Sequence, residues 1–444
     1  MNVRSAARRH LVFGVFGLCL SVWGLWQDIG WIAQPFYAYA WWTYIFLLDG
    51  FVALRRGDSL LTTRRRFIGP IVLWSVTFWF FFELLNIRFQ NWYYIGVFDV
   101  RAGPEVILGV VVFDVACFGT VFTGLFQTYE AIAALGLFRG RSIRPRRLAS
   151  AASYVIQGLG AVMVALAVLF PFYLAPLVWG SLTFLVDPWN YRRGARSLLG
   201  DVERGDVGIV ARLLLAGLVC GLVWESFNFL APQKWIYTVL GLEDLKLFEM
   251  PALGFLGFPS LALDAFAADA MIAYRFHGNE AWENPSDIPV EPRPRRPVSP
   301  TLFWGLTPLH VAFWGLVIVV IQEVNIGSVQ LEFQHLEGLP ARAVVRLEEQ
   351  GIRRPRQLLR ALDDPTRREQ IESSLGMGKD AIEDLIEEVR LFTLKGIGHD
   401  YGRLLQRVGI HTVADLDGQD PNTLYARLVE VRQAQTFPAL ALVA

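Results

Sequence analysis

Long apolar stretches recur along the first three quarters of the chain, separated by shorter polar segments. A helix that crosses a bilayer needs about 20 mostly apolar residues, and stretches of this kind occur at nine places. They cover residues 10–27, 36–54, 67–86, 105–125, 150–170, 171–187, 208–228, 253–274 and 302–322. The pattern predicts an all-α fold, a polytopic membrane helical bundle followed by a small helical domain.

Arginines cluster in every second polar segment. The clusters are Arg4/Arg8/Arg9, Arg55/Arg56/Arg64/Arg65/Arg66, Arg139/Arg141/Arg144/Arg146/Arg147, Arg192/Arg193/Arg196 and Arg293/Arg295/Arg296. Cytoplasmic loops are enriched in Lys and Arg, so we expect these segments and the N-terminus on the cytoplasmic side of a bacterial inner membrane. Nine spans then leave the C-terminal domain outside, and one re-entrant segment would reverse its side.

The first apolar run follows basic residues and precedes Ala38-x-Ala40, an arrangement that also occurs in secretory signal peptides. The cleavage-like box lies well beyond the end of the run. The run also has a counterpart in the second half of the chain. We therefore expect it to be a retained membrane span.

Two sequence blocks occur twice in the same order. ELLNIRFQNWYY at residues 83–94 returns as ESFNFLAPQKWIY at residues 225–237. FLLDGFVALRRGDSLL at residues 46–61 returns as FLVDPWNYRRGARSLL at residues 184–199. Each copy contains four predicted spans, an even number, so the copies share one orientation and form parallel repeats.

The domain organisation follows from these patterns. The predicted parts are repeat one at residues 1–138, repeat two at 139–275, a linker at 276–300, a ninth span at 301–323 and a soluble domain at 330–444. The linker holds six prolines from Pro285 onward, which disfavour a helix and predict an extended segment.

Composition supports a membrane protein, because 54% of the residues are hydrophobic and 18% are charged. All three cysteines lie inside apolar runs without a CxxC pair, so we interpret them as small buried residues. No pattern of metal ligands, nucleophile elbow, phosphate-binding loop or dinucleotide fingerprint occurs. The sequence thus favours a non-enzymatic role and leaves any cofactor unidentified.

The candidate binding residues are polar groups inside the predicted spans, together with tryptophans beside them. They are Glu83, Asn86, Asp114, Glu225, Asn228, Asp264, Trp92 and Trp235. Ionisable residues within membrane spans usually face a bundle interior and mark function, so the two Glu-Asn pairs and two Asp residues could bind a cation, a proton or a polar head group. The alternative is structural, with the glutamates bound to water, to Arg88 or to loop amides at the membrane boundary.

Two further acids, Asp49 and Asp187, precede the Arg-Arg-Gly sequences of the two repeats. Ion pairing with the neighbouring arginines is the ordinary explanation for an acid in this position. His310 in the ninth span is isolated, and we interpret it as a helix-packing residue.

The C-terminal region contains its own repeat at an offset of 58 residues. Leu336–Leu359 superposes on Leu394–Leu416, with Gly351-Ile352 matching Gly409-Ile410. This region resembles the helix-hairpin-helix superfamily, in the tandem form found in bacterial domains of unassigned function, and GIGHDYGRLLQRVGI carries the likeness.

In that superfamily a Gly-h-Gly turn presents backbone N–H groups to a DNA phosphate. The resemblance implies such a turn at Gly396 and Gly398, beside Lys395. Pro340 replaces the second glycine in the first copy and has no N–H to donate. Residues 323–444 carry 15 Lys and Arg against 19 Asp and Glu, a net charge of −4, whereas phosphate binding needs a cationic surface. Nucleic acid is therefore a disfavoured partner.

Three functions remain open from the sequence. The favoured one is a structural, assembly or protein-interaction subunit that contacts membrane lipids and binds a protein partner through residues 330–444. The second is a transporter or lipid-handling protein that uses the symmetric intramembrane acids. The third is a membrane-tethered DNA-binding protein, which requires a cytoplasmic C-terminal domain.

Overall fold

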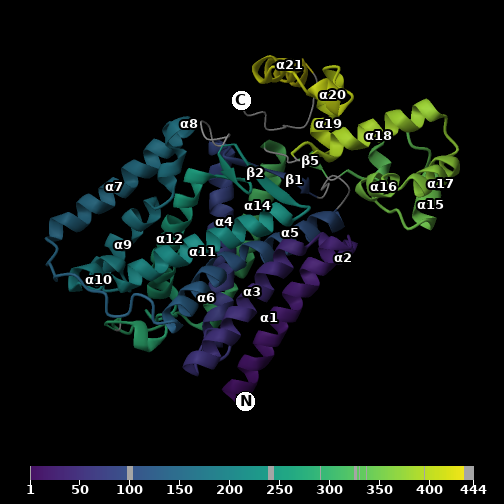
Figure 1. The fold of residues 1–444 in the computed structure, drawn as a ribbon. Helices are drawn as coiled ribbons and strands as arrows, with labels where there is room; N and C mark the ends of the chain where they lie inside the picture. The colour runs from purple at the N-terminus through teal and green to yellow at the C-terminus, as the bar shows by residue number, and fades with distance from the viewer. Residues whose placement is uncertain are drawn as a thin grey trace. The chain divides into compact units, whose positions relative to one another are not determined.

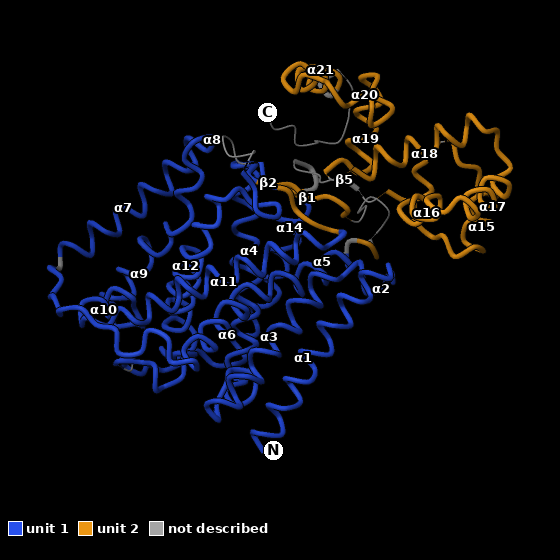
Figure 2. The backbone as a smooth tube through the Cα atoms, viewed as in Figure 1, with its two compact units in different colours: residues 1–91, 108–232, 237–319 blue, residues 92–107, 233–236, 320–444 orange. Residues whose placement is uncertain are grey.

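A computed structural model describes residues 2–97, 104–238, 245–290, 292–324, 328–329, 331–336, 338–394 and 396–434. The chain is mostly α-helical, with a few short strands (Figure 1). It divides into two compact units, coloured separately in Figure 2. Unit 1 comprises residues 1–91, 108–232 and 237–319, and unit 2 comprises residues 92–107, 233–236 and 320–444.

Seven helical segments are long and apolar enough to cross a membrane, among the described residues. They are Val3–Trp26, Arg65–Phe89, Leu108–Ala134, Ala151–Leu169, Gly208–Leu230, Ala252–Phe276 and Pro300–Ile321. These lengths and compositions are those of a multi-pass membrane protein. Two of the nine predicted spans, residues 36–54 and 171–187, are outside this set.

The first half of unit 1 is built around α1 and α3. Its elements are α1 (Val3–Trp26), α2 (Gly30–Ala33), α3 (Phe36–Arg56), η1 (Arg65–Phe67), α4 (Ile68–Phe89), α5 (Pro104–Phe118) and α6 (Thr120–Ala134). Helices α1 and α3 approach very closely, since a Cβ atom on Gly14 would lie 2.5 Å from the backbone nitrogen of Leu47. Small residues permit this kind of close helix packing in membranes.

The second half of unit 1 has a similar order of helices. Its elements are α7 (Ser150–Leu169), α8 (Pro171–Leu174), η3 (Ala175–Val178), α9 (Ser181–Arg193), α10 (Leu198–Arg204), α11 (Gly208–Leu230), η4 (Ala252–Leu256) and α12 (Gly257–Phe276). A Cβ atom on Gly160 of α7 would lie 2.5 Å from the backbone nitrogen of Leu185 on α9. Leu185 follows Leu47 by 138 residues, the same offset that relates the blocks at residues 46–61 and 184–199, so both halves share this contact.

Residues 171–187, predicted as one span, do not form a continuous helix. Pro171 begins α8, Pro176 lies in η3, and Gly180 adopts a left-handed backbone (φ 92°) just before α9. Proline lacks a backbone N–H and glycine tolerates positive φ, so these residues break the helix. Helix α9 has 13 residues and is about 20 Å long, shorter than the roughly 30 Å hydrocarbon layer.

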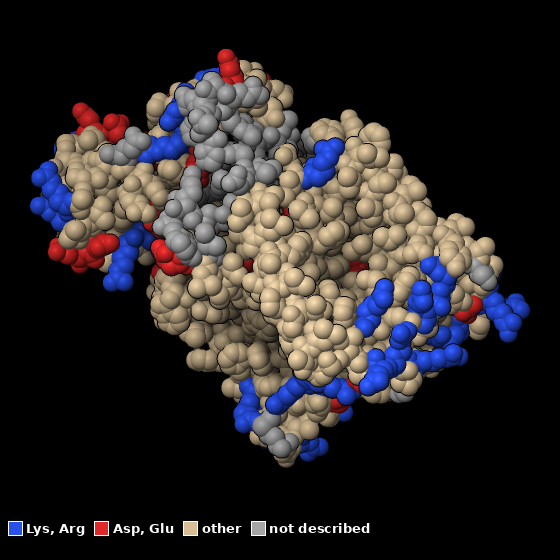
Figure 3. All heavy atoms as spheres, turned by 180° about the vertical axis from the view of Figure 1, so that it is seen from behind, with Lys and Arg blue, Asp and Glu red and all other residues tan. Residues whose placement is uncertain are grey.

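On the face of unit 1 seen in Figure 3, most Lys and Arg side chains gather at one end, which we call the Arg-rich end. Direct contacts join the loops there, because Ser142 pairs with Asp206 and Arg66 forms an ion pair with Glu280. The loops at residues 139–147 and 201–206 therefore lie together, and Arg66 lies beside residue 280.

The last helices of unit 1 are α13 (Pro300–Gly305) and α14 (Thr307–Val324). They run parallel to α4: Trp304 lies beside Gly69, the Thr77 hydroxyl is 2.7 Å from Nδ1 of His310, and Trp314 stacks on Phe80. Since α4 begins at the Arg-rich end, α14 ends at the opposite end. The His310 ring also packs edge-on against Trp74, so the prediction of a packing role for His310 is confirmed.

Unit 2 contains a three-stranded sheet in the order β2-β1-β5. Its strands are β1 (Trp92–Val97), which follows α4, β2 (Lys234–Tyr237), which follows α11, and β5 (Ser328–Val329), which follows α14. Strands β1 and β5 are parallel, with Ile95 paired with Ser328. Separately, β3 (Lys246–Leu247) and β4 (Met250–Pro251) form a small antiparallel hairpin.

The C-terminal region is helical and contains two matching helical hairpins. Its elements are η6 (Phe333–His335), α15 (Ala341–Glu349), α16 (Pro355–Leu362), α17 (Pro365–Leu375), α18 (Lys379–Thr393), α19 (Gly398–Arg407), α20 (Val413–Leu416) and α21 (Pro421–Ala434). Helices α15 and α19 end identically, because Gly351 and Gly409 both have positive φ (79° and 81°). The following N–H groups of Ile352 and Ile410 each donate to a leucine carbonyl five residues back.

Candidate functional site

The predicted intramembrane residues lie in the interior of unit 1. Glu83 and Asn86 on α4 are 2% and 1% exposed, and Glu225 and Asn228 on α11 are both 0% exposed. Both pairs lie near the C-terminal ends of their helices, at the end opposite the Arg-rich end. Burying an ionisable carboxyl group in hydrocarbon is costly, so each pair needs polar partners.

On α4, two hydrogen bonds of this pair are local. The indole N–H of Trp79 donates to Oε1 of Glu83 at 2.9 Å, one helical turn away. Oδ1 of Asn86 accepts the backbone N–H of Asn91 at 2.9 Å, just beyond Gln90, where the backbone turns left-handed (φ 52°) and the helix ends. Asn86 therefore stabilises the end of α4 and the start of the following loop.

On α11, the carboxyl group is less fully satisfied. The Tyr237 hydroxyl donates to Oε1 of Glu225 at 2.9 Å, and Asn228 also hydrogen-bonds to this side chain. Oε2 of Glu225 is buried without a hydrogen-bond partner among the described residues. Glu249, which is 3% exposed, lies close enough to interact electrostatically with Glu225.

Tryptophans connect the two polar sets. The rings of Trp79 and Trp224 are 5.0 Å apart, so α4 and α11 face each other at the level of the two glutamates. Beyond the helix ends, the backbone N–H of Thr238 donates to the carbonyl of Asn91 at 2.9 Å. The structure thus brings the repeated Glu-Asn pairs into one region of the interior.

The two predicted aspartates occupy different environments. Asp114 on α5 interacts electrostatically with Glu83 and so belongs to the same region. Asp264 on α12 instead accepts hydrogen bonds from the backbone N–H groups of Gly180 (2.7 Å) and Thr183 (2.6 Å) and from the Thr183 hydroxyl (2.6 Å). These donors lie at the start of α9, so Asp264 caps the shortened helix of the second half.

A chain of small polar groups continues along the interior between α3, α6 and α11. The Tyr44 hydroxyl is 2.9 Å from the Thr128 hydroxyl, and the Cys220 thiol donates to the same oxygen at 3.1 Å. Tyr37 packs against Trp224 and interacts electrostatically with Glu225. Cys117 and Cys220 are buried as predicted, whereas Cys19 is exposed, because it lies on the outward face of α1.

Asp49 and Asp187 bind backbone amides, which corrects the prediction that they pair with the neighbouring arginines. Asp49 accepts the N–H of Leu61 at 2.7 Å, and Asp187 accepts those of Leu198 (2.9 Å) and Leu199 (2.8 Å). In each half, one of these hydrogen bonds joins residues 12 positions apart in the sequence, Asp49 with Leu61 and Asp187 with Leu199. Arg55 and Arg193 are exposed, and Arg56 and Arg192 bind Asp287 and Gln157 instead. The buried carboxylates satisfy amides that would otherwise lack a partner.

Sequence reasoning missed a second polar site at the Arg-rich end. Residues 277–290, which we call the strap, lie within the segment predicted to be an extended linker. Trp282 is 2% exposed and stacks on Phe126 with ring centres 4.1 Å apart, while Tyr129 meets it edge-on. The strap is therefore packed into unit 1, and the linker prediction needs this correction.

Charged groups of the strap bind arginines from both halves of unit 1. Glu283 accepts three hydrogen bonds from Arg196, at 2.9 to 3.2 Å, and Arg196 also donates to Asp201 at 2.6 Å. Asp287 contacts Arg56 of the first half and Arg212 of the second.

Burial raises the pKa of Glu283 above its ordinary value, and the adjacent Arg196 offsets part of that shift. Asp201 has the same two influences in the same order, and its pKa is also raised. Both carboxyl groups nonetheless lie within hydrogen-bonding distance of Arg196, so the network is a buried ion cluster. Removing one partner from such a cluster destabilises the fold, because the remaining charge stays buried without its counter-charge.

A further strap contact reaches α6. Arg64 binds the buried carboxyl group of Glu130 and the backbone carbonyl of Trp282. Arg64 also pairs with Asp58 at 2.9 Å, and Asp58 accepts a hydrogen bond from Asn284 of the strap at 2.8 Å. No sequence pattern identified these groups, because apart from Arg64 and Asp58 the partners are far apart along the chain.

In unit 2, the predicted glycine hairpin lies against a strand. Gly396 and Gly398 have positive φ (89° and 61°), and α19 begins at Gly398. The Tyr93 hydroxyl on β1 is 3.5 Å from the Gly396 carbonyl oxygen, and the Tyr93 ring meets Tyr401 edge-on. Lys395 lies outside the described residues.

The predicted tryptophans belong to the same sheet. Trp92 on β1 is buried, and Trp235 on β2 is half-buried. In the first hairpin copy, Pro340 occupies the N-cap position of α15 and contributes no side-chain cap. Among the described residues, no group of three or more His, Cys, Asp or Glu is arranged to hold a metal ion.

Comparison with known proteins identifies one part of the chain. Residues 337–443 match the family model of a domain of unknown function, DUF4332. Neither the curated proteins nor the solved structures give a match to the chain.

Proposed function

We propose that the chain is a structural or assembly subunit of a bacterial inner membrane, and that its C-terminal domain, residues 330–444, binds a protein partner. The observation that carries the proposal is the contact of Tyr93 with the glycine hairpin, in which the Tyr93 hydroxyl lies 3.5 Å from the Gly396 carbonyl oxygen. A hairpin that in helix-hairpin-helix modules would receive a phosphate is here used to pack against the chain's own strand. Within unit 2, the hairpin therefore lies against β1.

The paired ends of α15 and α19 support a tandem helix-hairpin-helix interpretation of this domain. Its net charge of −4 over residues 323–444 favours a protein partner over nucleic acid. The parallel course of α4 and α14 favours an external location, because α14 starts at the Arg-rich end, which is the cytoplasmic end by the positive-inside rule. DNA binding, which needs a cytoplasmic domain, is for these reasons disfavoured.

The test is the mass of the particle extracted from native membranes with a mild detergent. We expect a protein mass above the 50.1 kDa of one chain, from a second polypeptide bound stoichiometrically. Val345 is the exposed large apolar side chain of the described C-terminal helices, at 54% exposure. Val345→Asp should release the partner, and Gln370→Asp on exposed α17 of the same domain should retain it. A monodisperse single chain would contradict the proposal.

A second function, proton or cation handling, is favoured by a different observation. Oε2 of Glu225 is buried without a partner among the described residues, and Asp114 lies within electrostatic reach of Glu83. Incompletely satisfied acids in a membrane interior are a feature of ion pathways. This hypothesis predicts that proteoliposomes conduct protons, measured with an enclosed pH-sensitive dye. Glu83→Gln with Glu225→Gln should abolish the flux, and the exposed Glu105→Gln should preserve it; equal flux in all three proteins would refute it.

A further inference from the structure

Helix α1 has two chemically different faces. The buried residues of α1 are all small, and they are Ala6, Ala7, Gly14, Ser21 and Gly24. The opposite face carries large apolar side chains, of which Val12 and Phe16 are each 66% exposed and Phe13 is 52% exposed. The small face packs on α3, so the bulky face is turned away from the rest of unit 1.

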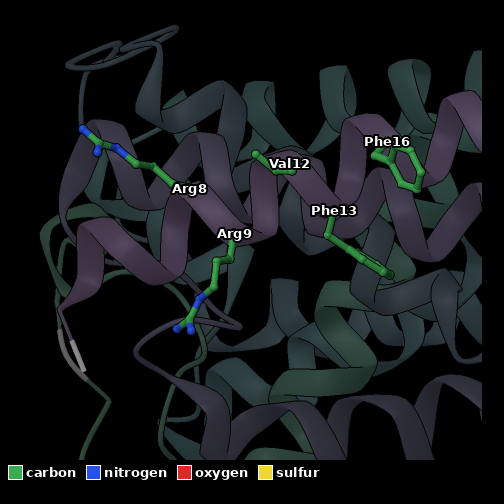
Figure 4. Close-up of a pocket in the computed structure, with 5 residues that line it drawn as sticks. All are labelled: Arg8, Arg9, Val12, Phe13 and Phe16. Atoms are coloured by element: carbon green, nitrogen blue, oxygen red, sulfur yellow. The ribbon is translucent and has the colours of Figure 1, made fainter.

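A shallow groove lies on the bulky face at the Arg-rich end. It has a volume of about 430 Å³ and is lined by Arg8, Arg9, Val12, Phe13 and Phe16. Figure 4 shows the two guanidinium groups at one end of this row and the Phe16 ring at the other. Phe13 is held in place by edge-on packing against Phe46 of α3, with ring centres 5.0 Å apart.

The order of these residues matches the depth profile of one membrane leaflet. Arg8 and Phe16 are eight residues apart, which corresponds to about 12 Å along a helix. Arginines at a membrane boundary keep their charge at the head-group level, while apolar side chains one or two turns away lie among the acyl chains. The groove is thus cationic where phosphates lie and apolar where acyl chains lie.

We propose that this groove binds an anionic phospholipid from the leaflet at the Arg-rich end, with the phosphate on Arg8 and Arg9 and an acyl chain along Val12, Phe13 and Phe16. Charge complementarity selects this occupant. A second copy of α1 in the same orientation would bring its own arginines against these two, and a free phosphate would leave the apolar part of the groove uncovered. The site is independent of the function proposed for the C-terminal domain.

The experiment uses the full chain in a neutral detergent and measures lipid retention by native mass spectrometry. The probes are phosphatidylglycerol and phosphatidylcholine with identical acyl chains. We expect phosphatidylglycerol to be retained preferentially, and Arg8→Gln with Arg9→Gln to weaken its binding by about thirtyfold, since each cationic side chain at a membrane surface contributes to anionic-lipid affinity. Arg8→Gln alone should give an intermediate loss if the double variant folds poorly.

The matched control is Arg139→Gln with Arg141→Gln, which removes two exposed arginines from the same end but outside the groove. This control should retain phosphatidylglycerol as the wild type does. Phe13→Ala with Phe16→Ala should weaken retention of the long-chain lipid, because both side chains line the apolar part of the groove. Three results would each overturn the proposal. They are equal losses of lipid in the groove and control variants, displacement of the lipid by millimolar phosphate alone, and a dimer that dissociates when Arg8 is changed.

Discussion

The strap makes a sharp prediction, because it contains two glutamates in opposite environments three residues apart. Glu283 is 1% exposed at its side chain and pairs with Arg196, which is 5% exposed. Glu280 is 48% exposed and pairs with Arg66, which is 71% exposed. We therefore expect Glu283→Gln to destabilise the protein strongly and Glu280→Gln to have almost no effect.

The magnitude follows from the geometry of the two pairs. Two opposite charges about 4 Å apart interact by about 4 kcal/mol at the effective dielectric constant of a protein interior near 20. Removing one partner of a buried pair costs about 3–5 kcal/mol, because the remaining charge stays buried. Arg196 keeps its bond to Asp201, so we expect the lower end of that range, about 3 kcal/mol, for Glu283→Gln. An exposed pair contributes about 0–1 kcal/mol.

The assay is thermal unfolding of the purified chain in a mild detergent, followed by intrinsic tryptophan fluorescence. Glu283→Gln should lower the melting temperature by several degrees, while Glu280→Gln should leave it within about one degree of wild type. Arg196→Met with Glu283→Leu should recover only part of the loss, because Asp201, which is 0% exposed, then keeps its bond to Arg204 alone. Equal melting temperatures for the two single variants would refute the packed strap.

Three further outcomes are expected. Asp264→Ala should lower thermal stability by about 1–3 kcal/mol, because it leaves the amides at the start of α9 unsatisfied. Gly14→Val should abolish folding, measured as monodisperse protein after extraction, since its Cβ would meet backbone at 2.5 Å; Gly158→Val, where no atom lies within 4 Å, should fold. Backbone N–H groups of the preceding turn lower the pKa of Asp415, so its cap contributes stability above the ordinary carboxyl pKa and loses it as pH falls through the lowered value. Hydrogen exchange of residues 411–416 in Asp415→Asn should therefore exceed that of wild type at pH 6 and converge with it in acid.

The parts of the fold that could be predicted from sequence are those in which one stretch carries its own signal. Apolar runs identified seven segments with the length and composition of membrane spans, and the repeated blocks located the Glu-Asn pairs that the interior brings together. The predicted segment at 171–187 failed as a continuous helix because mean hydropathy does not register how Pro171, Pro176 and Gly180 break the backbone.

The strap was not predictable, because its prolines and charges have the composition of a solvent-exposed linker. Its burial depends on partners remote in sequence: Glu283 lies 87 residues from Arg196, and Asp287 lies 231 residues from Arg56. A single sequence contains no sign of such pairings. The cap that Asp264 provides for α9 was missed for the same reason, since its donors lie 81 and 84 residues away.

The late position of the strap also has a consequence for biogenesis. Ribosomes add about 5–20 residues per second, so Arg196 exists for several seconds or more before Glu283 is made, and Arg56 waits longer for Asp287. Until then these arginines lack their acidic partners in the strap, Glu283 and Asp287. The strap also does not yet connect the two halves of unit 1 at the Arg-rich end. The strap contacts can therefore form only after α12 has been synthesised. A chain truncated at residue 276 should be inserted yet remain a target for membrane proteases.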